Sequence, residues 1–409
     1  MGKIIEESTI KKPEKTKIQK QKRILFCFGT RPEAIKMAPL IKEFEKYPEA
    51  FDTKICVTGQ QREMLDQVLH TFNITPDYDM NIMSKGQDLS DITIRILSGL
   101  REILKKIKPD LVLIHGDTTT SYSSALAAFY EKVPIGHVEA GLRTHNIKSP
   151  WPEEMNRQMI SKISTYHFAP TLLNKKNLLD EGIKEENIFV TGNTVIDALH
   201  LAIELVEKNQ NLKSSILLEL SEEKINKDLL EKWDNKERRM ILMTKHRREN
   251  LGESFVSFCL AIKNLANKYQ DVDFVYPVHL NPSIQKTVYG ELSDIKNVYL
   301  TKPLDYLPFL FLMKKSLFLI SDSGGIQEEA PGFGKPVLLL RNTTERPEAM
   351  DAGIVKLVGT DYDKTISETS LLLDDEQEYK RRSSVANPYG DGTTSKKIVK
   401  IISELNIGE

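Results

Sequence analysis

A chain of 409 residues is longer than one ordinary domain, so at least two domains are expected. Its formal net charge of −1 excludes the strong positive field that typifies nucleic-acid-binding proteins and proteins attracted to anionic membranes. Apolar residues make up 40% of the chain, enough for sizeable cores, yet no apolar run approaches the roughly 20 residues of a membrane-spanning helix.

The first 22 residues are rich in Lys and Glu and lack an apolar pattern, which predicts a disordered extension. They contain no apolar stretch of the kind found in a secretory signal. The three cysteines, Cys27, Cys56 and Cys259, lie far apart and have no metal-ligand spacing. Cys27 and Cys56 fall in predicted strands, which indicates buried thiols in a reducing compartment. We therefore expect a cytoplasmic protein.

From Arg23 onward, apolar runs of strand length alternate with helix-like segments. In the first half, strands are predicted at 24–28, 54–57, 110–115, 133–138, 166–168 and 188–190, with a loop at 75–88. A charged, loosely helical region at 207–238 separates them from strands predicted at 240–243, 274–276, 298–300, 317–320 and 336–340. This alternation is typical of α/β folds. We predict two doubly wound, Rossmann-like domains, about 23–200 and 201–379, with the ligand site in the cleft between them.

The segment 317–329 has the pattern of an anion site. An unbroken apolar run is followed by Ser321–Gly325 and then by a helix-forming stretch. Glycine lets backbone N–H groups approach a ligand closely, and a helix N-terminus presents unpaired N–H groups to the same place. Taken alone, the segment is equally compatible with an ordinary strand-to-helix turn.

Further cations follow other predicted strands. Arg31 and Lys36 come after the first strand, the run 246–248 follows the strand at 240–243, and Arg346 follows the strand at 336–340. Arginine can grip a phosphate with two donors, so these residues favour a diphosphate site. Taken alone, Lys36 is better explained as surface charge. The first turn carries neither a dinucleotide fingerprint nor a P-loop, which weighs against a dehydrogenase or a kinase.

Carboxylates gather after strands of the first half. Asp117 follows the strand at 110–115, Glu139 follows the strand at 133–138, and Glu153 begins a helix after a proline-rich turn. Clustered carboxylates can raise one another's pKa, which suits general acid–base chemistry. Each also has a plainer explanation: Asp117 as a helix cap, Glu153 as a partner of a helix dipole, and Glu139 as an ion-pair partner of Arg143.

Several motifs together resemble those of the non-hydrolysing UDP-N-acetylglucosamine 2-epimerases. They occur in order at 28–39 (FGTRPEAIKMAP), 115–120 (HGDTTT), 136–144 (GHVEAGLRT), 150–157 (PWPEEMNR), 191–197 (TGNTVID), 246–250 (HRREN), 276–282 (YPVHLNP), 322–331 (DSGGIQEEAP) and 343–348 (TTERPE). The resemblance covers the chain from about Arg23 to its end.

This resemblance implies a GT-B fold in which the last helices, about 380–409, cross back to the first domain. It implies reversible conversion of UDP-N-acetylglucosamine (UDP-GlcNAc) to UDP-N-acetylmannosamine (UDP-ManNAc) without NAD, metal or other cofactor. The family mechanism is anti elimination of UDP, an enzyme-held 2-acetamidoglucal, and re-addition of UDP. A homodimer serving polysaccharide biosynthesis is expected, with a second UDP-GlcNAc as a possible activator.

The resemblance also assigns residues. Asp117, Glu139 and Glu153 would be the acid–base carboxylates, with their individual roles unassigned, and His246 would support the departing diphosphate. The expected UDP-binding residues are Arg31, Lys36, Ser323, Gly324, Gly325, Glu329 and Arg346, with Phe309 lining the uracil pocket. Activator positions correspond to Gln60, Arg247 and His279. The chain departs from its relatives at Glu63, where some carry Gln, and at Lys245, where Gly is frequent.

Three other functions remain open at this point. A hydrolysing epimerase would release ManNAc and UDP. A retaining glycosyltransferase of the same fold would need an acceptor pocket, and it gives no reason for the three carboxylates. A UDP-sugar-binding regulator would bind without turnover.

Overall fold

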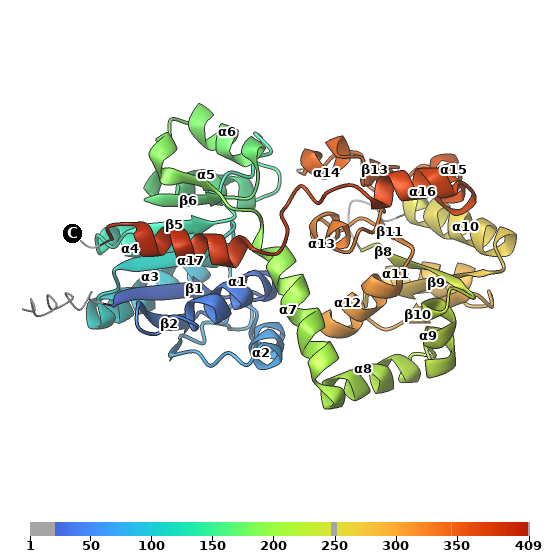
Figure 1. Cartoon of the computed structure of the whole chain (residues 1–409), viewed down its shortest axis with the longest axis horizontal. Coiled ribbons are helices and arrows are strands. Elements are labelled where there is room, and N and C mark those ends of the chain that lie inside the picture. Colours follow the sequence, from blue (N-terminus) through green and yellow to red (C-terminus); the bar gives the residue numbers. More distant parts are fainter. Residues whose placement is uncertain (1–20, 247–251, 345, 408–409) are drawn as a thin grey trace, which may run out of the picture.

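The structure is a computed structural model that describes residues 21–246, 252–344 and 346–407. Two α/β lobes lie side by side, and helix α7 (Thr194–Lys208) runs between them (Figure 1). A second connection leads into the last helix, α17 (Thr394–Glu404), which lies on the first lobe (Figure 1). No helix of the described part of the chain is both long and apolar enough to span a membrane.

The first lobe is built on a seven-stranded sheet in which every neighbouring pair is parallel. Across the sheet the strands are β3 (Tyr78–Asp79), β2 (Phe51–Val57), β1 (Lys22–Phe28), β4 (Leu111–His115), β5 (Ile135–Val138), β6 (Tyr166–Ala169) and β7 (Ile188–Val190). The helices of this lobe are α1 (Arg31–Phe44), α2 (Arg62–Thr71), α3 (Leu89–Ile107), α4 (Thr119–Tyr130), α5 (Glu153–Ile163) and α6 (Leu172–Asp180).

Both faces of this sheet are buried, which explains its unbroken apolar strands. Along β1, Ile24 and Phe26 pack in one core with α1, whereas Leu25 and Cys27 pack in a second core with α3 and α4. Successive side chains of a strand point to opposite faces, so a strand covered on both sides has no polar alternation.

The second lobe repeats the arrangement with a six-stranded sheet, again with all neighbouring pairs parallel. Its strands in spatial order are β10 (Val298–Thr301), β9 (Val272–Pro277), β8 (Arg239–Thr244), β11 (Phe318–Ser321), β12 (Val337–Leu339) and β13 (Val355–Leu357). Its helices are α8 (Gln210–Glu222), α9 (Lys227–Asp234), α10 (Glu253–Lys268), α11 (Pro282–Leu292), α12 (Tyr306–Lys315), α13 (Ile326–Gly332), α14 (Pro347–Asp351), α15 (Tyr362–Asp374) and α16 (Glu376–Ser383).

The predicted fold class, two doubly wound α/β units, is confirmed by these sheets. Two short edge strands were not predicted. The segment 75–88, expected to be a loop, contains β3, and β13 lies between the last predicted strand and the helical end of the chain. Both have only two or three residues, too few for a periodic signal.

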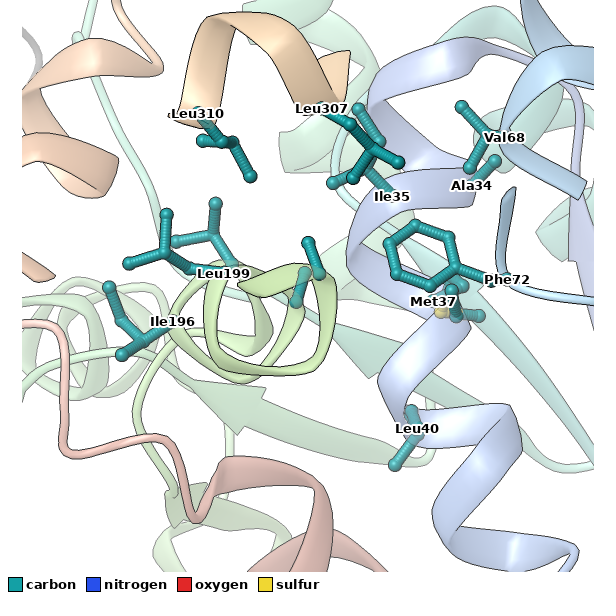
Figure 2. Packing of buried hydrophobic residues seen from close by; sticks show 14 of the residues in the cluster. Ala34, Ile35, Met37, Leu40, Val68, Phe72, Ile196, Leu199, Leu307 and Leu310 are labelled. Atoms are coloured by element: carbon teal, nitrogen blue, oxygen red, sulfur yellow. The ribbon is translucent and has the colours of Figure 1, made fainter. Parts of the chain in front are cut away.

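Helix α7 joins the two lobes through apolar packing. Its residues Ile196 and Leu199 face Leu310 on α12 of the second lobe, while α1 of the first lobe lies on its other side (Figure 2). Gly332 of α13 also lies against α7, because a Cβ built there would sit 2.7 Å from a methyl carbon of Leu199. The lobes therefore share one continuous core along α7.

Polar contacts hold α17 on the first lobe. Asp197 of α7 accepts hydrogen bonds from the backbone N–H groups of Thr394 (3.2 Å) and Ser395 (2.7 Å), which start α17. At the other end, Lys22 Nζ donates to the carbonyls of Ile402 and Leu405 at 2.9 and 2.8 Å. A carboxylate at the helix N-terminus and an ammonium at its C-terminus both complement the helix dipole.

Candidate active site between the lobes

A buried cluster of charged side chains joins the carboxyl edges of the two sheets. Lys36 lies on α1, just after β1, and Glu139 directly follows β5. Lys36 Nζ donates to Glu139 Oε2 and, at 3.0 Å, to Glu328 Oε2 on α13 of the second lobe. Arg346 precedes α14, and its Nε donates to Glu328 Oε1 at 2.7 Å. The first lobe thus supplies a cation and a carboxylate, and so does the second.

The members of this cluster hold one another in their charged forms. Only 9% of the Glu139 side chain and 11% of the Lys36 side chain are exposed. Burial alone would raise the pKa of Glu139, but Lys36, His115 and Arg346 outweigh it and hold this pKa well below its usual range. Burial would lower the pKa of Lys36, yet Glu139 and Glu328 raise it. Glu139 is therefore an ionised carboxylate at neutral pH.

The backbone and a neighbouring amide fix the position of Glu139. Its φ angle is +64°, a conformation that residues other than glycine seldom adopt. Asn193 Nδ2 donates to Glu139 Oε2 at 2.8 Å, from the start of α7. Such strained positions persist where the surrounding structure holds them, and they concentrate at functional sites.

His115, the last residue of β4, lies beside Glu139. Its Nε2 is 3.8 Å from Glu139 Oε2 and makes no hydrogen bond to any described residue. Burial, with Lys36 acting in the same direction, lowers the pKa of His115 to about 4 although Glu139 opposes the shift. The imidazole is therefore neutral at pH 7. It belongs to the HGDTTT motif, but the sequence alone gave it no role.

Asp117 is held by an arginine from α5. Arg157 donates to Asp117 Oδ2 through Nη2 and, at 3.1 Å, through Nε. The same guanidinium donates to Glu154 Oε2 at 3.0 Å. Glu154 is fully buried and also accepts the backbone N–H of Thr144 at 3.0 Å, so it fixes the loop that follows β5. Arg157 was not singled out from the sequence, although it closes the PWPEEMNR motif.

Glu153 differs from its neighbour Glu154. It begins α5 and is partly exposed, and its side chain makes no hydrogen bond or ion pair with the described residues. Asp117 and Glu139 both act electrostatically on His115, so these two carboxylates lie near one another at the edge of the sheet. The described contacts do not join Glu153 to either of them.

On the second lobe, the turn after β11 is open to solvent, and the buried residue Asp322 at its start holds His246 beside it. Asp322 is fully buried and accepts the backbone N–H of His246 at 2.9 Å, while His246 Nδ1 lies 3.1 Å from its other oxygen. A Cβ built on Gly325 would meet nothing within 4 Å. The His246 side chain is 44% exposed. A buried aspartate thus positions an accessible histidine beside an unobstructed backbone turn.

Comparison with known proteins places this architecture in a family. A model of the family described as UDP-N-acetylglucosamine 2-epimerase matches residues 42–403. The chain belongs to this family. It is 53% identical to the UDP-N-acetylglucosamine 2-epimerase of Campylobacter jejuni over 93% of this chain and 97% of that protein. The corresponding protein of Escherichia coli K12 is 50% identical, over 94% and 99% of the two chains.

Solved structures agree with this assignment. The crystal structure of UDP-GlcNAc 2-epimerase from Neisseria meningitidis bound to UDP-GlcNAc has a TM-score of 0.83 and 49% identity. The match covers 94% of this chain and all of that one. The chain therefore has the two-lobed GT-B architecture of UDP-N-acetylglucosamine 2-epimerases.

Several residues that the family resemblance assigned to UDP lie near the cluster. Burial and Glu328 raise the pKa of Glu329 to about 7, while Lys36 and Arg31 oppose this shift. Arg31 also lines a hollow of about 170 Å³ with Tyr306. Phe309 is partly buried against the large core. Ser323 and Gly324 are partly exposed in the open turn.

The predicted activator residues fall into two places. Gln60 Oε1 accepts a hydrogen bond from Thr120 Oγ1 at 2.8 Å in the first lobe. His279 is exposed on the second lobe, and its ring lies 6.1 Å from that of His246, nearly parallel to it. Arg247 lies outside the described residues, as does the rest of the basic run after His246.

Two plainer explanations from the sequence are wrong. Lys36, taken alone, suggested surface charge, but its ammonium group is buried between carboxylates of both lobes. Arg143 was the suggested partner of Glu139, but it pairs with Glu181 at 2.6 Å. In both cases the true partner is distant in the chain. Among the described residues, no group of three His, Cys, Asp or Glu side chains is arranged to hold a metal ion.

Proposed function

We propose that this protein reversibly epimerises UDP-GlcNAc at C2 to UDP-ManNAc, without net hydrolysis. The family assignment supports the substrate class, as does the similar Neisseria meningitidis protein, which binds UDP-GlcNAc. The observation that carries the proposal is the buried Glu139–Lys36–Glu328–Arg346 cluster, which joins the carboxyl edges of the two sheets. It combines an ionised carboxylate on one lobe with a cation on the other.

In the proposed reaction, a carboxylate of the first lobe takes the proton from C2 as the C1–O bond to UDP breaks. The electron pair of the C2–H bond forms the C1=C2 double bond, which gives 2-acetamidoglucal and UDP. Re-addition of UDP, with a proton delivered to C2 from the other face, gives the epimer. Asp117, Glu139 and Glu153 are the proposed acid–base groups. Glu139 has the strongest support, because its neighbours keep it ionised and positioned.

The second lobe would hold the departing UDP. Its diphosphate would lie at the Ser323–Gly325 turn, where a Cβ built on Gly325 would meet nothing within 4 Å, with Arg346 and His246 as charged or hydrogen-bonding partners. Arg31, Glu329 and Phe309 would complete the nucleotide site. Such preorganised donors stabilise the negative charge that develops as the C1–O bond breaks.

Incubation with UDP-GlcNAc in D₂O tests this reaction against its rivals. We expect UDP-ManNAc and deuterium at C2 of the recovered nucleotide sugars, with no free ManNAc. Accumulation of ManNAc and UDP would instead identify a hydrolysing epimerase, and transfer of the sugar to an added acceptor would identify a glycosyltransferase. Binding of UDP-GlcNAc without deuterium incorporation would indicate a regulator that does not turn over.

Two further expectations from the family resemblance remain predictions. A homodimer would elute at twice the chain mass in size-exclusion chromatography with light scattering. Activation by a second UDP-GlcNAc, through Gln60, Arg247 and His279, would appear as faster UDP-ManNAc turnover when a trace of UDP-GlcNAc is added.

A further inference from the structure

A large hollow of the second lobe lies at the opposite end of its sheet from the candidate active site. It is a cavity of about 880 Å³. Its floor includes Arg239 and Met240, which begin β8, together with Leu317 just before β11 and Lys335 just before β12. Because these parallel strands run away from the cavity, the proposed UDP turn lies at their other ends. The cavity has no part in the epimerisation proposed above.

The wall of the cavity provides apolar surface suited to the body of an organic molecule. Its apolar residues include Ile203 and Val206 of α7, Trp233 of α9, Phe311 of α12 and Leu373 of α15. Small-molecule sites are typically concave, mostly apolar and roughly 300–1,000 Å³ in volume, a range that includes this cavity.

The charge of the lining is strongly positive, unlike that of the chain. Seven lysine and arginine residues and three carboxylates line the cavity, a difference of four charges, whereas the whole chain carries −1. Each carboxylate already has a partner: Glu207 pairs with Lys314, Asp234 with Lys315, and Glu376 with Lys380. Two of the lining cations are also paired, because Arg238 contacts Asp273 and Arg239 contacts Asp271, both just outside the lining. The positive charge that remains comes from lysines.

Three lysines of the lining make no ion pair with any described residue: Lys213, Lys236 and Lys335. Lys213 and Lys236 are exposed at the rim, but Lys335 is partly buried. Burial lowers the pKa of Lys335, and no carboxylate of the described residues opposes that shift. A partly desolvated cation without a counter-charge raises the free energy of the folded protein. An anion bound beside Lys335 would lower it.

We propose that this cavity binds a small organic anion that has an apolar or aromatic body. Lys335 contacts its charged group, Lys213 and Lys236 add attraction at the rim, and Trp233 and Phe311 cover its apolar part. Neutral sugars lack the charge, and cationic ligands would be repelled by the lining.

The fluorescent probe 8-anilinonaphthalene-1-sulfonate, an aromatic sulfonate, tests the proposal directly. The chain has two tryptophans, and Trp151 is exposed, so Trp151→Phe leaves Trp233 in the cavity wall as the single donor for energy transfer. In this background we expect saturable quenching of Trp233 emission as the probe binds. Saturating UDP should leave the probe's affinity unchanged, because UDP is expected at the other end of the sheet.

Lys335→Met should weaken probe binding about tenfold or more, because it removes the charged contact while keeping the side chain's bulk. Lys286→Met, on an exposed lysine of α11 outside this cavity, should have no effect. The double variant Lys213→Glu/Lys236→Glu reverses two exposed rim charges and should weaken binding several-fold even if Lys335→Met fails to fold. UDP binding by each variant verifies its fold.

Equal probe affinity in wild type, Lys335→Met and the rim variant would overturn the proposal. So would displacement of the probe by UDP, or quenching that never saturates. None of these readouts requires turnover, so the result is independent of whether the protein is an epimerase.

Discussion

The two lobes have the same strand order but use equivalent positions differently. Asp117 follows β4 and Asp322 follows β11, the corresponding strands of the two sheets. The Asp117 side chain is 25% exposed and is held by Arg157. The Asp322 side chain is fully buried and contacts His246. One carboxylate is accessible for chemistry, and the other is part of the scaffold.

Two buried lysines show the same contrast. Lys36 and Lys245 both come from the segment after the first strand of their sheet in chain order, β1 and β8 respectively. Two carboxylates raise the pKa of Lys36, whereas burial lowers the pKa of Lys245 to about 8. Lys245 Nζ has no hydrogen-bond partner among the described residues and lies over the rings of Phe255 and Phe258. Topology sets where a charged group lies, and its neighbours set its ionisation.

The largest effect is expected when the ionised carboxylate Glu139 of the first lobe is removed. Glu139→Gln should slow deuterium exchange at C2 of UDP-GlcNAc about 10²–10⁴-fold, because a positioned proton acceptor is lost. UDP affinity, measured by calorimetry, should change little, since Glu139 is not part of the proposed UDP site. Glu186→Gln, on an exposed carboxylate of the same lobe, is the control. Undiminished exchange would remove Glu139 from the acid–base role.

The next largest effect is expected when Arg157, the arginine that holds Asp117, is replaced. Arg157→Met should destabilise the protein by about 3–5 kcal/mol, because it leaves the buried Glu154 without its cation. Urea unfolding would measure this change. Arg101→Met, which breaks an exposed pair with Glu102, should cost less than about 1 kcal/mol. Similar losses in the two variants would show that burial does not distinguish these pairs.

A smaller effect is expected from the cation of the second lobe. Arg346→Ala should weaken UDP binding by about 1.5–3 kcal/mol, the size of a lost hydrogen bond to a charged group. Arg381→Ala, an exposed arginine on α16, should leave UDP affinity unchanged. Titration calorimetry with UDP compares them. Unchanged affinity in Arg346→Ala would refute a contact between Arg346 and the nucleotide.

The smallest effect is expected for Lys245, and it tests the contrast between Lys245 and Lys36. Lys245→Met should stabilise the protein at pH 7 by about 1–3 kcal/mol, because it removes a desolvated ammonium group that has no hydrogen-bond partner among the described residues. The unfolded chain binds this proton more tightly than the folded protein, so wild-type stability recovers as pH rises from about 8 to the ordinary lysine value near 10.4. The gain from Lys245→Met should shrink over that range.

Lys36→Met is the matched comparison. It should destabilise the protein at pH 7, because Glu139 and Glu328 would be left buried without their shared cation. Denaturant midpoints at pH 7 and pH 10 for both variants distinguish the two cases. A loss of stability in Lys245→Met at pH 7 would contradict the assigned difference.

The sequence predicted what local patterns encode. The unbroken apolar runs of β1, β4 and β11 located the buried strands, and the residues after them located the edge at which polar groups gather. It did not predict partners across the cleft. Lys36 of α1 and Glu328 of α13 are 292 positions apart. The sequence of neither helix indicates that the two residues form a buried pair. The roles of Arg157 and Asn193 likewise depend on contacts between elements that no local spacing reveals.

The path of the chain has a practical consequence for dissecting the molecule. Since α17 is fastened to Asp197 at one end and to Lys22 at the other, the first lobe is assembled from both ends of the polypeptide. The second lobe is one uninterrupted segment between α7 and α17. A recombinant fragment that stops before α17 would leave α1 partly uncovered, so autonomous expression of the first lobe requires splicing α17 back onto it.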